Sequence, residues 1–127
     1  MKLTHTLHSA NRSLVLVRRI VADLQRTRDG FRTQRRELLR KELREQGVER
    51  ADLEQVVERQ RNQLRALKRE LGDIGAVYRE GLVRFRALSS QGPLELIWKP
   101  GADALESWCH SDGVTRPISE LPSDALG

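Results

Sequence analysis

With 127 residues, the chain has room for one modest hydrophobic core. Charged residues make up 32% of it, aromatic residues only 4%, and the net charge is +5. This composition is typical of a coiled-coil or long-helix protein and argues against a compact enzyme. The single cysteine, Cys109, excludes an internal disulfide framework and fits a reducing compartment, so we expect a cytoplasmic protein. No stretch approaches the ~20 apolar residues that a membrane span needs.

The first predicted element is a long helix over residues 6–46. Between Leu7 and Leu38, apolar residues recur at alternating steps of three and four, as on one face of a helix. Thr6 is a suitable N-cap, because its hydroxyl can accept a hydrogen bond from an unpaired backbone N–H. Gly30 lies inside the helix at a cost of roughly 1 kcal/mol relative to Ala. Gly47 is expected to end it.

A second helix is predicted over residues 51–71, after a turn at 47–50. A connection this short makes the two helices antiparallel, so residues 6–71 form a helical hairpin. Folding about that turn pairs Arg35 with Gln60 and leaves the apolar start of the first helix uncovered by the second.

The composition changes after the second helix to Gly, Pro, Ser and β-forming residues. Residues 81–85 and 94–98 alternate as strands do, and the 89–93 segment between them reads as a turn. Residues 104–110 suit either a third strand or a short helix, and 114–118 a last edge strand. We expect these elements to form a small antiparallel sheet.

The predicted fold class is therefore α+β, with a long antiparallel, coiled-coil-like helical hairpin and a small C-terminal antiparallel sheet packed on the start of the first helix. We expect one domain, in which residues 6–71 form the hairpin, 72–118 the β-rich region and 119–127 a loosely ordered tail.

Two parts of the chain carry motifs that are similar to those of a known family. They are the helical opening Thr6-Leu7-x-x-Ala10-Asn11 and, later, Gly81-Leu82-Val83-x-Phe85, Ile97-Trp98-x-x-Gly101, Trp108 and Arg116. In order and spacing, these motifs resemble a prokaryotic family of uncharacterised proteins, domain of unknown function 2203. The resemblance spans nearly the whole chain and supports the fold, but the family brings no established activity with it.

Several polar positions of the family pattern differ in this chain. Arg84 stands where the resemblance leads us to expect an acidic residue, and Arg86 where it leads us to expect proline. Cys109 stands at the position expected to be histidine. The lysine-aspartate pair expected before Gly81 falls on Ala76 and Val77, and the acidic residue expected after Gly101 is Ala102. If the family has a site, the resemblance implies that it is altered or lost here.

Cys109 and His110 are the adjacent pair of residues best suited to chemistry, either as two metal ligands or as a thiol nucleophile with a nearby base. Adjacent residues of a strand point to opposite faces, which favours an incidental pair. His5 and His8 would be needed to complete a zinc site, and both suit plain surface positions equally well. We predict no catalytic residues, no metal site and no cofactor.

Five residues are candidates for a binding site in the cleft between the sheet and the helix start. These are Asn11, Trp98, Trp108, His110 and Arg116. Each of them could have a structural role instead of a binding role. The tryptophans suit a core that closes the sheet onto the helix, and the amide of Asn11 suits a tie between a loop and the helix. Arg116 suits an ion pair with Asp112, or an anionic ligand.

Nine arginines between Arg18 and Arg44 make the helical hairpin basic. They are scattered around the helix and interrupted by Glu37, Glu42 and Glu45, which favours a solvated, salt-bridged surface over a nucleic-acid interface. We find no phosphate-binding glycine loop, dinucleotide fingerprint or Ser-His-Asp order.

Three functions are compatible with the sequence. The first is an interaction or scaffold protein that self-associates or binds a protein partner. It would do so through the hairpin, using Leu39, Leu43 or Val56, or through the exposed surface of the α+β part at the base of the hairpin. The second is a nucleic-acid-associated accessory protein that uses the arginines. The third is a small-ligand or metal binder that uses the five candidate residues. The first is the one we expect.

Overall fold

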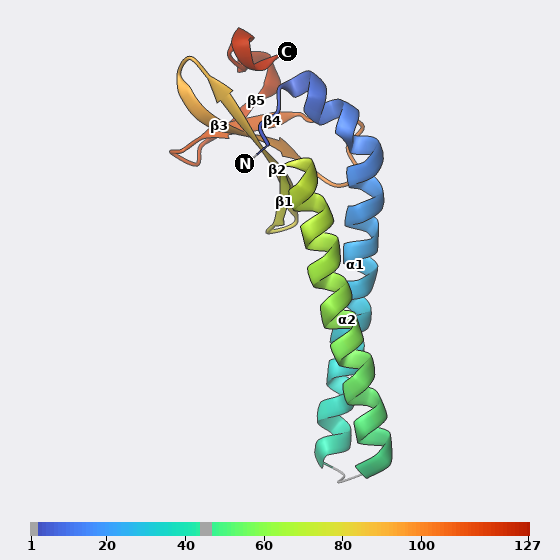
Figure 1. The fold of residues 1–127 in the computed structure, drawn as a ribbon. Helices are drawn as coiled ribbons and strands as arrows, with labels where there is room; N and C mark the ends of the chain where they lie inside the picture. Colours follow the sequence, from blue (N-terminus) through green and yellow to red (C-terminus); the bar gives the residue numbers. More distant parts are fainter. Residues whose placement is uncertain (1–2, 44–46) are drawn as a thin grey trace. The chain divides into compact units, whose positions relative to one another are not determined.

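The computed structural model describes the backbone of residues 3–43 and 47–127 and the side chains of residues 3–40 and 51–127. Two long helices come first, α1 (Leu7–Leu43) and α2 (Gly47–Ile74). A five-stranded antiparallel sheet follows them (Figure 1). The predicted α+β fold is therefore confirmed.

The start of α1 is capped by side chains and by the far end of the chain. The Thr6 hydroxyl accepts a hydrogen bond from the Ser9 N–H at 3.2 Å, and the Ser9 hydroxyl accepts one from the Thr6 N–H at 2.9 Å. The His8 N–H donates to the carbonyl oxygen of Leu126 at 3.0 Å. These bonds satisfy N–H groups that the first turn of a helix leaves unpaired. Thr6 is thus the N-cap, as predicted.

The connection between the helices differs from the prediction. Gly47 was expected to end the first helix and residues 47–50 to form a turn, but Gly47 is the first residue of α2. Glycine is accepted at a helix start, and the residues after it are compatible with helix. At its far end α2 reaches Ile74, three residues beyond the predicted end at residue 71. Gly75 follows with φ +88°, a left-handed conformation that favours glycine and ends the helix.

Residues 22–69 form a compact unit, and residues 1–21 with 70–127 form another. The expectation of a single domain stays a prediction. Within the unit of residues 22–69, a Cβ added at Gly30 would lie 3.1 Å from the Gln60 side chain, and the Arg61 guanidinium lies 5.8 Å from the Phe31 ring centre. Gln60 therefore faces Gly30, and the predicted pairing of Arg35 with Gln60 is wrong. The earlier start of α2 shifts the register.

The sheet belongs to the other unit, and its strand order follows the sequence. The strands are β1 (Ala76–Arg79), β2 (Leu82–Ser89), β3 (Gly92–Trp98), β4 (Ser107–His110) and β5 (Thr115–Pro117). The sequence had not indicated β1. It pairs with β2 through a turn in which Glu80 and Gly81 both have positive φ, at 56° and 77°. That is the geometry of a tight hairpin turn, here without the usual Asn-Gly or Asp-Gly signal.

One face of the sheet, the inner face, is buried with the start of α1. On β2 the inner residues are Val83, Phe85 and Ala87, each with no exposed surface. Ala10 and Leu14 of α1 are also buried, with at most 1% of their surface exposed. The alternation of β2 brings Arg84, Arg86 and Leu88 to the opposite, outer face.

The tail is better ordered than the sequence suggested. Residues 119–127 were expected to be loose, but they contain parts of two short 3₁₀-helices, η1 (Ile118–Glu120) and η2 (Ser123–Ala125). Ala125 is completely buried, and the Asp124 carboxylate accepts a hydrogen bond from the Ser90 N–H at 2.5 Å. The tail is held because it contacts both the helix start and the turn between β2 and β3.

Candidate functional site

Two of the five predicted binding residues, Asn11 and Trp98, hold the loop between β3 and β4. The side-chain oxygen of Asn11 accepts a hydrogen bond from the Leu105 N–H at 2.9 Å. The indole N–H of Trp98 donates to the Ala102 carbonyl oxygen at 2.9 Å. Arg18 completes the group, because it donates to the Asp103 carbonyl oxygen at 2.6 Å and lies 5.9 Å from the Trp98 ring centre. In these contacts Asn11 and Trp98 act as structural residues, which is the alternative to ligand binding that the sequence also offered.

The other three predicted residues come together on the inner face of β4 and β5. The Trp108 and His110 rings meet edge to face at 4.8 Å, and the Arg116 guanidinium lies 5.5 Å from the Trp108 ring centre. The indole N–H of Trp108 donates to the Pro117 carbonyl oxygen at 2.9 Å. The structure thus divides the five predicted residues into two groups, each engaged in internal contacts.

Arg116 and Asp112 form a closed pair at the turn between β4 and β5. Arg116 donates to both carboxylate oxygens of Asp112, at 2.9 and 3.3 Å. This hydrogen bonding, together with the Val114 N–H, lowers the pKa of Asp112 from 3.8 to about 2. Arg116 is therefore engaged by the carboxylate that the sequence suggested as its partner.

The remaining histidine and cysteine candidates do not converge. Cys109 lies on the outer face opposite Glu95, and its neighbour His110 pairs with Leu94 on the other face. His5 is buried, with Nε2 2.5 Å from the Ile74 carbonyl oxygen and Nδ1 3.0 Å from the Ser9 hydroxyl. No group of three His, Cys, Asp or Glu residues within the described residues could hold a metal ion.

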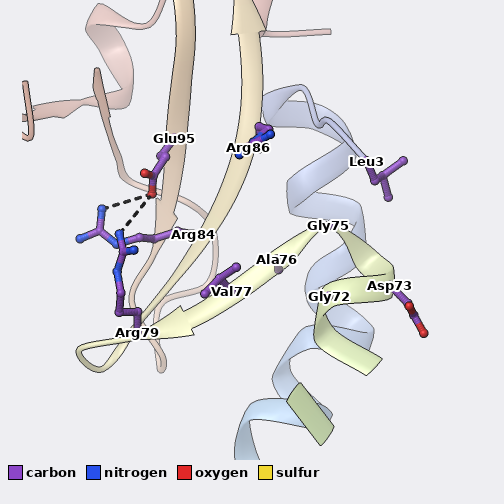
Figure 2. Close-up of a pocket in the computed structure, with 10 residues that line it drawn as sticks. All are labelled: Leu3, Gly72, Asp73, Gly75, Ala76, Val77, Arg79, Arg84, Arg86 and Glu95. Atoms are coloured by element: carbon purple, nitrogen blue, oxygen red, sulfur yellow. Dashed lines mark hydrogen bonds and ion pairs between the residues drawn. The ribbon is translucent and has the colours of Figure 1, made fainter. Parts of the chain in front are cut away.

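A pocket of about 500 Å³ lies on the outer face of the sheet beside the end of α2. We call it the outer-face pocket. Its charged lining is dominated by three arginines, Arg79 from β1 and Arg84 and Arg86 from β2, with Glu95 from β3 (Figure 2). Gly75 and the exposed side chains of Val77 and Leu3 provide its apolar part.

The charges in the outer-face pocket are only loosely paired. Glu95 lies 3.4 Å from Arg84 and 3.9 Å from Arg79, longer than the 2.7–2.9 Å typical of charged N–H···O bonds. The Arg84 Nε atom is buried and has no hydrogen-bond partner among the described residues. Arg84 also reaches the Cys109 sulfur, at 3.8 Å.

The sequence did not indicate this pocket, although the alternation of residues in the predicted strand 81–85 contained part of the signal. Arg84 and Arg86 are two residues apart in a predicted strand, so they could have been assigned to one face. Arg79 lies on the strand that was not predicted, and Glu95 and Cys109 reach Arg84 only through the strand pairing. Arg84 and Cys109, two of the positions that depart from the family pattern, prove to be neighbours here.

Fold and motifs together define a protein with a paired helical segment and a five-stranded antiparallel sheet. Residues 4–115 match the family described as "Uncharacterized conserved protein (DUF2203)". The chain belongs to this family, as its motifs suggested. No curated protein and no solved structure matches the chain. Within the described residues, neither helix is apolar enough over a sufficient length to cross a lipid bilayer.

Proposed function

We propose that the protein is a non-catalytic interaction protein that self-associates through its helical pair, the α1 and α2 segments between residues 22 and 69. The observation that carries this proposal is the incomplete burial of the apolar stripe between the two helices. A second copy of the chain is the occupant that would complete it.

The stripe is covered most poorly along the distal part of α1. Among the described side chains from Gln25 to Arg40, none is fully buried, and 55% of the Leu39 surface is exposed. Phe31 and Leu38 are half-buried, as are Val56 and Leu64 of α2. Two helices cover an apolar stripe from one side only, whereas four helices enclose it. Leu43, also expected at this surface, lies outside the described side chains.

The distal part of α1 and the start of α2 expose charges of opposite sign. Arg32, Arg35, Arg36 and Arg40 are exposed on α1. Asp52, Glu54 and Glu58 are exposed near the start of α2. If α1 of one copy lies beside α2 of the other, basic and acidic residues meet across the interface. Such pairing would orient the copies more than it would strengthen their association.

The test is the light-scattering mass of the purified protein over a series of concentrations and ionic strengths. We expect an oligomer that persists in salt, and we expect Leu39→Lys to shift it toward monomer. Leu88→Lys is the matched control, because Leu88 is as exposed as Leu39 but lies on the sheet, at 58% against 55%. A wild-type protein that is monomeric at every concentration would refute self-association.

Absorbance at 260 and 280 nm in the same experiment tests the nucleic-acid alternative. Copurifying nucleic acid that dissociates in salt would replace our proposal with a role for the arginines, because phosphate contacts weaken steeply with ionic strength. A ligand or metal in the cleft bounded by the five candidate residues stays a prediction. We also propose a cytoplasmic location, where a lone thiol such as Cys109 stays reduced.

A further inference from the structure

We propose that the outer-face pocket binds a small organic anion, with a carboxylate or phosphate group held by Arg79, Arg84 and Arg86 and an apolar body lying against Val77 and Leu3. This site is separate from the helical pair and does not depend on self-association. Its volume of about 500 Å³ is in the range of small-molecule sites.

The three arginines are presented by two paired strands, which fixes the positions of their backbones and the face of the sheet on which they lie. Arg84 and Arg86 share the outer face because they are two residues apart on β2. Arg79 is the last residue of β1 and pairs with Leu82, the first residue of β2. Guanidinium groups bind carboxylates and phosphates through paired N–H donors, which makes such anions the natural ligands of this cluster.

The internal carboxylate leaves much of this donor capacity unused. Glu95 has a contact to Arg79 at 3.9 Å and one to Arg84 at 3.4 Å, and about two-fifths of its side chain, 42%, is exposed. The side chain of Arg86 has no hydrogen-bond or ion-pair partner within the described part of the chain. An entering anion can therefore gain short charged hydrogen bonds without breaking a tight ion pair.

The other side of the pocket sets the orientation of the ligand. The end of α2 at Gly72 and Asp73 carries the negative end of the helix dipole, and Figure 2 shows Asp73 pointing away from the arginines. An anionic group is disfavoured there and favoured beside the arginines. The apolar body of the ligand then lies near Val77 and Leu3, which are exposed by 56% and 52%.

The experiment is isothermal titration calorimetry at low ionic strength with three probes, namely phenyl phosphate, benzoate and inorganic phosphate. We expect saturable binding of phenyl phosphate or benzoate, with phenyl phosphate tighter than inorganic phosphate because only the former has an apolar body. The better of the two aromatic probes identifies the anionic group. Absence of saturable binding for both aromatic probes at millimolar concentration, or equal affinity for phenyl and inorganic phosphate, would overturn the proposal.

Substitutions of opposite sign separate a built site from general attraction to a basic protein. Arg86→Gln should raise the dissociation constant about tenfold, whereas Glu95→Gln, which removes the competing carboxylate, should lower it several-fold. Arg12→Gln is the matched control, since Arg12 is exposed on α1 and does not line the pocket. It should leave the constant unchanged.

Weaker binding by Glu95→Gln, or equal losses in Arg86→Gln and Arg12→Gln, would also overturn the site. Because Arg86 is exposed and Glu95 is half-exposed, neither substitution should unfold the protein. Circular dichroism of each variant verifies this before titration.

Discussion

The side-chain oxygen of Asn11 accepts a hydrogen bond from the backbone N–H of Leu105, 94 residues further along the chain. Asn11 lies on the second turn of α1, and Leu105 lies in the loop between β3 and β4. A single amide thus fastens the sheet to the helix on which it packs. Leu105 is buried, so its N–H has little access to water as an alternative partner.

Asn11→Ala should lower the free energy of unfolding by about 1–3 kcal/mol, because it leaves a buried backbone N–H unpaired. Asn11→Asp keeps an acceptor at the same position and should lose less. Urea denaturation of the three proteins measures both differences. An alanine variant as stable as wild type would mean that the loop is not held by this bond.

Phe85→Ala should destabilise the protein by about 3–5 kcal/mol, since it empties a fully buried site at the centre of the inner face. Leu88→Ala on the same strand should change stability by less than about 0.5 kcal/mol, because Leu88 is 58% exposed. Thermal or urea unfolding compares the two. Similar losses from both would contradict the assignment of inner and outer faces along β2.

Stability in acid should depend on Asp112. Its pKa is lowered from 3.8 to about 2, chiefly by the Arg116 hydrogen bond, so the folded state binds the proton less readily than the unfolded state. The stabilising contribution is therefore complete above pH 3.8 and is lost as the pH falls toward 2. Asp112→Asn should remove this part of the acid dependence, measured as the slope of unfolding free energy against pH. An unchanged slope in the variant would rule out the pair as its source.

Gly30→Ala should raise the free energy of unfolding by roughly 0.5–1 kcal/mol, because alanine is the better helix former. The added methyl group would lie 3.1 Å from the Gln60 amide nitrogen, the flexible end of a side chain that can move aside. Gly72→Ala is the control, as its added methyl meets nothing within 4 Å. A clear loss of stability at Gly30 alone would show that Gln60 is locked in place.

The sequence was most informative where a pattern is local. Helical periodicity predicted both helices because side chains three and four residues apart share a face whatever lies opposite. Thr6 was predicted as a cap for a similar reason, since its partner Ser9 is only three residues away. Alternation likewise located β2 and β3, and placed Cys109 and His110 on opposite faces of their strand.

Errors occurred where the signal is weak or comes from distant parts of the chain. The start of the second helix was placed four residues too late, at residue 51 instead of Gly47, and that shifted the predicted partner of Gln60. The short strand β1 lacks a marked hairpin signal. The order of the tail was missed because its partners, the His8 and Ser90 backbone groups, lie far away in sequence.

The sequence alone therefore determined the fold class, the family, the two helices and the strands β2 and β3, because periodicity, capping and motif order are properties of neighbouring residues. Only the tertiary structure decided which polar side chains from distant parts of the sequence meet. Asn11 and Trp98 converge on one loop, and Trp108, His110 and Arg116 converge elsewhere. Arg79, Arg84, Arg86 and Glu95 share a pocket that no motif marked. Their proximity depends on strand order and register, which arise from the packing of the whole chain.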